Sequence, residues 1–131
     1  MSRIRKPTRI SLPPLTGIIR GTTTFNFHVV GESFYQAELR EIRDHMSVAY
    51  ENDLDAFIVT EPNNPHDRNA CAVYIDSFKV GYLPKEAAAN YVAQMRAMKA
   101  FGESCFQIRA KLTGGFGDKP NIGVLLNLPI E

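Results

Sequence analysis

The sequence predicts a mainly β domain, folded as a small, mostly antiparallel barrel of six strands with two short helices. Short apolar runs, several of which alternate with polar residues, are separated by turn-forming residues. The chain shows no repeated alternation of strand and helix of the kind that builds a parallel sheet. Its 131 residues, 44% of them hydrophobic, are enough for one core and therefore for one domain.

Residues 1–23 are predicted to form a flexible basic arm or a strand-edge extension, and residues 24–131 the folded domain. The arm carries five basic residues, no acidic residue and three prolines, and it lacks helical or strand periodicity. The first strand is predicted at residues 25–29, where apolar and polar residues alternate before Gly31.

Two short helices are predicted. Ser33 followed three positions later by Gln36 fits a capping box, which would start the first helix. Its apolar stripe would consist of Tyr35, Leu39, Ile42 and Met46. The second helix is predicted to begin at Pro84, because the fixed φ of proline suits a first helical position. Its apolar stripe would consist of Ala88, Tyr91, Val92 and Met95, with Met98 as a further candidate.

The other strands follow from apolar runs. These runs are residues 56–60, 70–75, 80–83, 106–112 and 122–128. The first two flank a stretch rich in Pro and Asn, which predicts an antiparallel pair joined by a long loop. Turns are predicted at residues 76–79 and 114–117. Six strands with helices at the edge indicate a barrel of the OB-like kind.

The composition argues against several classes of protein. The sequence contains no G-x-x-x-x-G-K-[ST] element for phosphates and no stretch of about 18 continuous apolar residues. Cys71 and Cys105 lie far apart without C-x-x-C spacing, which predicts two buried, reduced thiols. The histidines and carboxylates lack metal-ligand or catalytic spacing, so we expect no metal, no cofactor and no enzyme activity. A cytoplasmic protein is expected, with association with the nucleoid as the alternative.

The charge distribution leaves two function classes open. The formal net charge is only +1, yet residues 32–61 hold eight acidic residues and two basic ones. A nucleic-acid-binding protein of this charge needs a local patch, because its overall field is too weak to steer a polyanion. The acidic stretch together with an exposed strand edge would instead suit a protein–protein interaction or adaptor module without nucleic-acid binding.

The most informative segment is residues 62–69, with the sequence Pro-Asn-Asn-Pro-His-Asp-Arg-Asn. Its polar side chains both donate and accept hydrogen bonds, and its prolines reduce the entropy lost when the loop is fixed against a ligand. Asn64 either caps its own turn or binds a ligand. His66 and Asp67 are expected to face a ligand, because binding residues concentrate on loops.

Four segments, taken together in their order and spacing, closely resemble the HIRAN domain. They are Val30–Gln36, Thr60–Ala70, Val80–Pro84 and Ile122–Val124. The resemblance implies a small β-rich module that binds single-stranded DNA and recognises its 3′ end, in processes such as DNA repair and replication. A separately encoded helicase or nuclease is a candidate partner, and no membrane is expected.

The resemblance also implies roles for single residues. Asp67 would contact the terminal 3′ hydroxyl, and His66 occupies the position of a tyrosine that stacks on a base. Ser33 and Phe34 stand where a DNA-binding member of the family has an Arg and a Tyr that contact DNA. Lys85 matches a lysine near the DNA, where it would bind a phosphate.

The complete predicted DNA-binding set is Ser33, Phe34, Tyr35, Asn64, His66, Asp67, Tyr82, Lys85, Arg109 and Lys111. Aromatic stacking would supply most of the affinity, about 1 to 3 kcal/mol per stacked base. Tyr82 either stacks on a base or packs against Tyr91. Arg109 and Lys111 either extend a basic track or form a solvated strand face.

Overall fold

The computed structural model describes residues 6–21, 24–25, 27–45, 54–98 and 104–129. Within these residues seven strands form one sheet, and six of them follow the order β2-β7-β6-β3-β4-β5, while β1 pairs with β6. The strands are β1 Gly17–Ile18, β2 Phe27–His28, β3 Leu54–Thr60, β4 Cys71–Ile75, β5 Phe78–Tyr82, β6 Cys105–Phe116 and β7 Lys119–Leu126. All neighbours in the six-strand path are antiparallel, whereas β1 and β6 are parallel.

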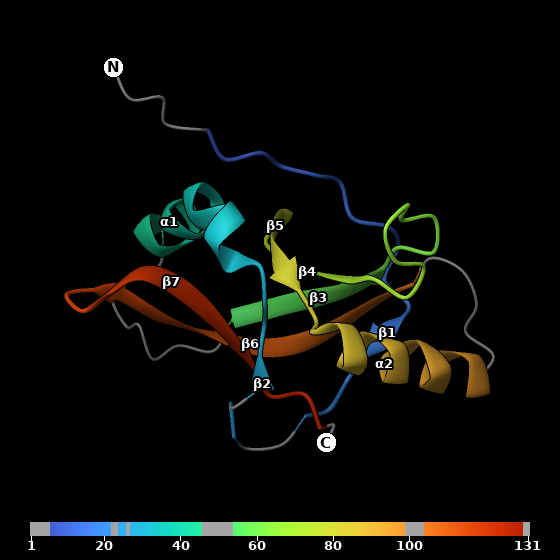
Figure 1. Ribbon diagram of the computed structural model, residues 1–131. Helices are drawn as coiled ribbons and strands as arrows, with labels where there is room; N and C mark the ends of the chain where they lie inside the picture. The colour runs from blue at the N-terminus through green and yellow to red at the C-terminus, as the bar shows by residue number, and fades with distance from the viewer. Residues whose placement is uncertain (1–5, 22–23, 26, 46–53, 99–103, 130–131) are drawn as a thin grey trace.

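The helices are the 3-10 helix η1 Glu32–Tyr35, α1 Gln36–His45 and α2 Lys85–Ala97. Figure 1 shows the sheet curved into a half-barrel, with α1 beside its upper part and α2 beside its lower part. The predicted fold class, a mainly β and mostly antiparallel barrel with two short helices, is therefore confirmed.

One isolated bridge joins the two ends of the curved sheet. Val30, just after β2, exchanges two backbone hydrogen bonds of 2.9 Å with Tyr82 at the end of β5. Val29 also donates to Val124 O in β7 at 3.1 Å. Because β2 and β5 are the outer strands of the path, this segment connects β7 to β5 and places the following η1 against both.

The main core fills the inside of the half-barrel. It combines inward residues of the strands with Leu39 of α1 and with Ala88, Tyr91 and Met95 of α2. The stripe predicted for α2 therefore faces the core except for Met98, which is the C-cap and is 62% exposed. The helix begins at Lys85, so Pro84 is its N-cap and not the predicted first helical residue. Met46, the last residue of the first predicted stripe, lies outside the described residues. Cys71 belongs to this core and is buried as predicted.

A smaller cluster lies on the opposite face of the sheet. It consists of Val59, Ala72, Tyr74 and the buried Cys105. Neighbouring residues such as Ile58 and Val73 belong to the main core, and successive side chains of a strand point to opposite faces. Leu12 packs against this cluster from the N-terminal segment.

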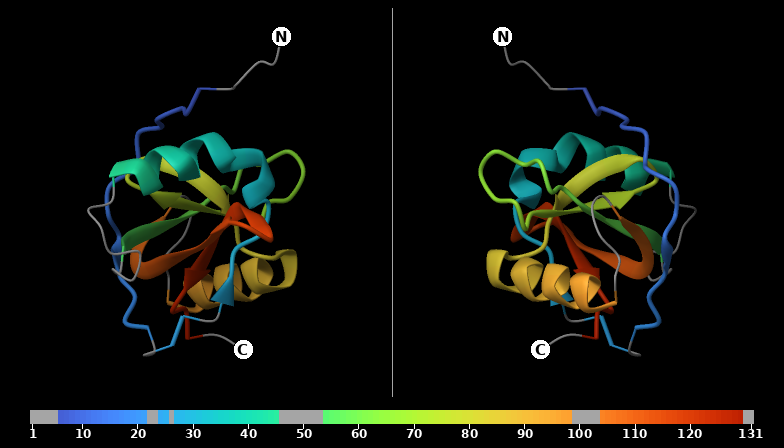
Figure 2. Two further views of the ribbon diagram at one scale, coloured as in Figure 1. Left: turned by 90° about the vertical axis from the view of Figure 1, so that its left-hand side faces the viewer. Right: turned by 90° about the vertical axis from the view of Figure 1, so that its right-hand side faces the viewer.

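Residues 6–21, called here the N-terminal strap, run along the outside of the domain (Figure 2). Thr8 N donates to Glu38 Oε2 at 2.9 Å, and Ile10 N donates to Ser77 O at 2.8 Å. Further along, Thr16 N donates to Cys105 O at 2.7 Å, and β1 then pairs with β6. The strap is therefore hydrogen-bonded to α1, to the β4–β5 turn and to β6.

The predicted capping box at Ser33 and Gln36 is wrong. The 3-10 helix follows Gly31, whose φ of 80° is left-handed, and no side chain caps it. The Gln36 side chain instead bonds β7, because Nε2 donates to Ile122 O at 2.9 Å and Oε1 accepts from Ile122 N at 2.8 Å. The local pattern cannot indicate this partner, which lies 86 residues away in the chain.

Strand β5 begins earlier than the strand predicted at residues 80–83. The chain reverses over Asp76 and Ser77 alone, so that β5 starts at Phe78. Both turn residues have positive φ, 52° and 64°. Such a turn matches the twist of a hairpin but is usually marked by Gly or Asn, which explains why the sequence suggested a longer connection.

Two other boundaries were also predicted wrongly. Among the described residues of the strand predicted at 25–29, Phe27–His28 pair with β7 as a strand. The stretch 114–117, predicted as a turn, continues β6 as far as Phe116, and the chain reverses at residues 117–118. A register shift between Gly114 and Phe116 absorbs the positive φ of the glycines within a strand.

We expect Gly81→Ala to destabilise the domain at the closing bridge. A Cβ at this position would lie 2.5 Å from Val29 Cγ1 and 2.6 Å from Val30 O. The added methyl must separate the two backbones, which should cost about 2 to 3 kcal/mol of unfolding free energy. Urea denaturation would measure the loss.

Gly117→Ala is the matched control, because Gly117 has a φ of 46° but a Cβ there would meet nothing within 4 Å. Its expected cost is only the roughly 1 kcal/mol of left-handed backbone strain. Equal losses in the two variants would contradict the importance of the close approach.

Candidate nucleic-acid interface

The loop between β3 and β4, residues 61–70, is fixed by its own hydrogen bonds. Its ends are joined by Glu61 N, which donates to Ala70 O at 2.9 Å. Asn64 Oδ1 accepts from His66 N at 2.8 Å and from Asp67 N at 3.1 Å. Asn64 therefore caps the turn, as one of its two predicted roles required.

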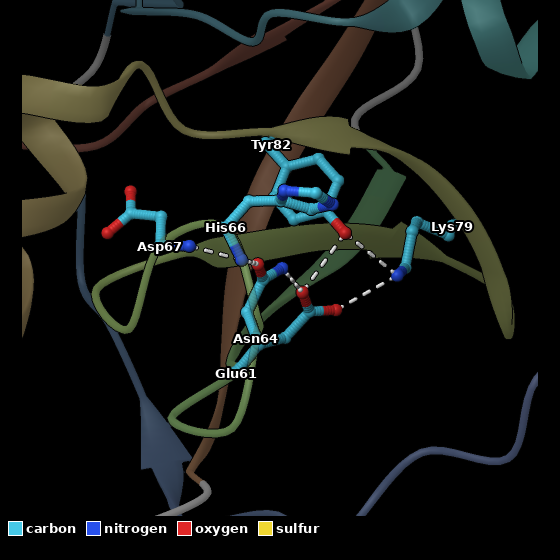
Figure 3. A network of polar contacts seen from close by, with 6 residues as sticks. All are labelled: Glu61, Asn64, His66, Asp67, Lys79 and Tyr82. Carbon is cyan, nitrogen blue, oxygen red and sulfur yellow. Dashed lines mark hydrogen bonds and ion pairs between the residues drawn. The ribbon is translucent and has the colours of Figure 1, made fainter.

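A network of polar side chains ties this loop to β5 (Figure 3). Glu61 Oε1 accepts from Asn64 Nδ2 at 2.9 Å and from the Tyr82 hydroxyl at 3.0 Å. Lys79 Nζ donates to Glu61 Oε2 at 2.9 Å and to the Tyr82 hydroxyl at 3.0 Å. The Lys79 and Glu61 side chains are only 17% and 21% exposed, so solvent screens this ion pair less than a surface pair.

The network shifts the pKa values of Glu61 and Lys79 in opposite directions, and both shifts favour the ionised form. Burial acts to raise the pKa of Glu61, but the hydrogen bonds from Lys79, Asn64 and Tyr82 and the Lys79 charge outweigh it, and the pKa is lowered. Burial acts to lower the pKa of Lys79, but its hydrogen bonds to Glu61 and Tyr82 raise it overall. At neutral pH the pair is therefore ionised, and the loop is held by charge-assisted hydrogen bonds.

Two hollows lie on this loop. One of about 610 Å³ is lined by residues 62–68, and one of about 830 Å³ by residues 61–65 with Lys79 and Tyr82. Both include residues 62–65, so the two hollows adjoin each other. The carboxylate of Asp67 points away from the Glu61–Lys79–Tyr82 network in Figure 3, and its Oδ1 accepts from Asn69 N at 2.9 Å. His66 is exposed.

The predicted residues of η1 and α2 lie on the same side of the barrel as this loop. Figures 1 and 2 together show η1 and the loop on one side, with the C-terminal end of β5 between them. Phe34 is 77% exposed, Ser33 is exposed and Tyr35 is half-buried. Lys85 is exposed in the first turn of α2, three residues after Tyr82.

Arg109 and Lys111 lie elsewhere, on the polar face of β6. Arg109 forms an ion pair of 2.7 Å with Asp55, its partner across the strands. Asp55 and Thr60 are five residues apart in β3, about 17 Å along the strand, so Arg109 is remote from the loop. Lys111 Nζ lies 4.6 Å from the centre of the Phe25 ring. Within the described residues, no group of three His, Cys, Asp or Glu side chains could hold a metal ion.

Comparison with models of known protein families shows to which family the chain belongs. The family model of the HIRAN domain matches residues 22–112, which is more than half of the chain. The chain belongs to the HIRAN domain family. No curated protein and no solved structure gave a significant match. HIRAN domains are a DNA-binding family, and the fold and the loop are consistent with nucleic-acid binding.

Two residues that stabilise the loop of this HIRAN domain were not predicted as part of the site. Glu61 adjoins the predicted loop, and Lys79 is a cation within an otherwise apolar run. The structure brings them together, because β4 places the start of the loop beside β5. A charged residue at a half-buried strand position requires a partner, but the turn predicted at residues 76–79 hid this signal, because it placed Lys79 outside the strand. No described helix is long and apolar enough to span a membrane.

We expect Glu61→Gln to reduce both the stability and its dependence on acid pH. The folded-state pKa of Glu61 lies below the ordinary value of 4.5, so its stabilisation is complete above that pH and is lost as the pH falls through the folded value. The variant should be less stable by about 1 to 2 kcal/mol near neutrality.

Urea titrations at about pH 7 and about pH 3 would measure both effects. The loss of unfolding free energy on acidification should be smaller for Glu61→Gln than for the wild-type protein. Glu86→Gln, which removes an exposed carboxylate in α2, is the control and should follow the wild type. An unchanged acid dependence in Glu61→Gln would show that the network does not hold the ionised form.

Proposed function

We propose that this HIRAN domain is a non-catalytic module that binds single-stranded DNA and receives its free 3′ end on the loop at residues 61–70. The observation that carries the proposal is the rigidity of this loop. The Glu61–Lys79–Tyr82 network and the Asn64 cap fix the backbone that leads to Asp67, and Ala70 N donates to Asp67 O at 3.0 Å on its other side, so that little entropy is lost on binding. The proposed setting is DNA repair or replication, where free 3′ ends occur.

Asp67 is the proposed contact for the terminal sugar. Its Oδ1 accepts from Asn69 N, an interaction that fixes the orientation of the carboxylate. Its Oδ2 would accept a hydrogen bond from the 3′ hydroxyl, whereas a 3′ phosphate would be repelled by the negative charge. A single carboxylate would therefore distinguish the two kinds of DNA end.

The bases and phosphates would contact the neighbouring exposed groups. Phe34 on η1 and His66 on the loop present rings to solvent on the same side of the barrel. Each stacked base would contribute about 1 to 3 kcal/mol. Lys85, exposed in the first turn of α2, would bind a phosphate. Tyr82 has its hydroxyl engaged by Glu61, so we propose for it mainly the positioning of the loop.

Two observations favour this function over a protein adaptor. An adaptor that adds a strand to the sheet requires a free edge, but the outer edge of β5 already pairs with Arg9 at Phe78 and with Val30 at Tyr82. Two acids of the acidic stretch are also engaged internally, because buried Glu38 accepts from Thr8 N and Glu61 bonds β5. These acids are therefore not part of an exposed docking surface.

We expect wild-type protein to bind a short single strand with a 3′ hydroxyl at least about tenfold more tightly than the same strand with a 3′ phosphate. Asp67→Asn retains an oxygen acceptor for Asn69 N but removes the charge, and the preference should fall below about threefold. Fluorescence anisotropy with both strands, each at two salt concentrations, would measure these affinities.

Asp44→Asn removes an exposed carboxylate from α1 and is the matched control, which should keep the wild-type preference. The two salt concentrations identify phosphate contacts, because every phosphate contact makes the affinity fall more steeply as the salt concentration rises. Binding without preference for either end would overturn the proposed role of Asp67 but not the proposed binding of single-stranded DNA. An absence of binding at low salt would overturn the proposed function and favour the adaptor.

A further inference from the structure

A third hollow, of about 380 Å³, lies on the other side of η1, away from the loop. We call it the hairpin groove, because one wall is η1 at Gly31–Ser33 and the rest belongs to β2 and the β6–β7 hairpin. His28, Lys119 and Asn121 are among its polar lining residues. Nothing in the proposed function uses this groove, although it includes Ser33, a residue of the predicted DNA-binding set.

The groove lies on the outer face of the sheet. Ile122, Val124 and Leu126 of β7 point into the main core, so the residues between them point outward. Leu125, one of these outward residues, lines the groove and lies directly across from Lys111 of β6. Lys111, which lies away from the loop, therefore stands beside the hairpin groove, on the same face of the sheet.

The 3-10 helix η1 connects the groove to the loop side of the domain. It contacts β5, whose Tyr82 bonds the loop network, and also β7, which forms the floor of the groove. Ser33 lines the groove, and the next residue, Phe34, is 77% exposed. A strand that leaves the loop and passes over Phe34 would therefore reach the groove without crossing a buried part of the domain.

The chemistry of the groove suits a sugar–phosphate backbone. Lys119 supplies a positive charge, and His28, Ser33 and Asn121 supply hydrogen-bonding groups. The lining acid, Glu32, has its Oε2 occupied by a hydrogen bond from Val124 N of 3.3 Å. The exposed Asp118 lies in the turn next to Lys119. The carboxylates of Glu32 and Asp118 balance the charges of Lys119 and Lys111 on this face, so a phosphate would be bound by the individual lysines and hydrogen-bond donors rather than attracted by a net positive groove.

The groove owes part of its depth to Gly123, which has no side chain. A Cβ at this position would lie 3.1 Å from Glu32 Oε2 and 3.1 Å from Thr113 Cγ2. A larger residue would therefore both fill the hollow and displace Glu32 from the Val124 N–H. The glycine allows an extended chain to lie close to the backbone of the sheet.

We propose that the hairpin groove binds the nucleotides on the 5′ side of the DNA end that occupies the loop. The inference rests on the proposed function, because a 3′ terminus at Asp67 leaves only the 5′ direction for the rest of the strand. Lys119 contacts a phosphate of this segment, and Lys111 extends the basic path along β6. The single strand thus crosses η1, with Phe34 as the stacking platform between two binding sites.

The first test compares two oligonucleotides that share their 3′ end, of about 4 and about 12 nucleotides. The longer one should bind wild-type protein at least about tenfold more tightly, because all of its additional nucleotides lie on the 5′ side of the shared 3′ end. Lys119→Gln should weaken binding of the long strand at least about threefold and leave the short one unchanged. Its salt dependence should fall by about 0.7 in slope for one lost phosphate contact.

Arg96→Gln is the matched control, because it removes an exposed cation from α2, which does not line the groove. A second test locates the long strand on the surface. Asn121→Cys would be labelled with a maleimide, against Ala93→Cys on the exposed side of α2 as the control. The native cysteines are buried, and burial raises the pKa of Cys71 to about 12, which suppresses its reaction.

The long oligonucleotide should protect Asn121→Cys from labelling, the short one should not, and neither should protect Ala93→Cys. If wild-type protein binds both lengths equally and Lys119→Gln binds like wild type, the loop site stands and the groove proposal is overturned. Labelling of Asn121→Cys that the long strand leaves unchanged overturns it equally. If wild-type protein binds neither oligonucleotide, the proposed function fails, and the groove proposal fails with it.

Discussion

The backbone pairing of Val30 with Tyr82 is the constraint on which the rest of the structure depends. It closes the curved sheet by linking the segment after β2 to the end of β5. The same Tyr82 pairs with Ala72 at the start of β4, and its hydroxyl bonds Glu61 at the end of β3. One residue therefore sets the relative positions of η1, β5 and the β3–β4 loop, which are the elements of the proposed interface.

The order of strands and helices was predictable because each obeys a local rule. Alternation identifies β6, and the run of apolar residues before and after the loop identifies β3 and β4. Apart from the turn at Asp76 and Ser77, which lacks the usual Gly or Asn, the clearest failures depend on distant partners. Gln36 fits a cap but bonds Ile122, and β1 exists only because it lies along β6. Such pairings follow from closure of the sheet, which no window of sequence contains.

The sequence predicted the loop that carries the candidate site, but not which side chains of the site contact one another. Pro and Asn marked residues 62–69 correctly, and the composition could not decide between capping and binding for Asn64, which the structure places in the turn. The Glu61–Lys79 pair needs the register of β4 with β5 before it can be recognised. Arg109 and Lys111 share an alternating pattern, yet one is paired with Asp55 and the other stands beside the hairpin groove.

The limits of the family match have a practical consequence for protein production. The matched residues 22–112 begin after β1 and end within β6. A fragment expressed with those limits lacks β7, whose inward side chains complete the core, and lacks the strap that bonds buried Glu38. It would carry an unpaired edge on β6 and uncovered apolar surface, two features that favour aggregation. Expression boundaries and fusion points for this domain therefore belong outside the strap and β7.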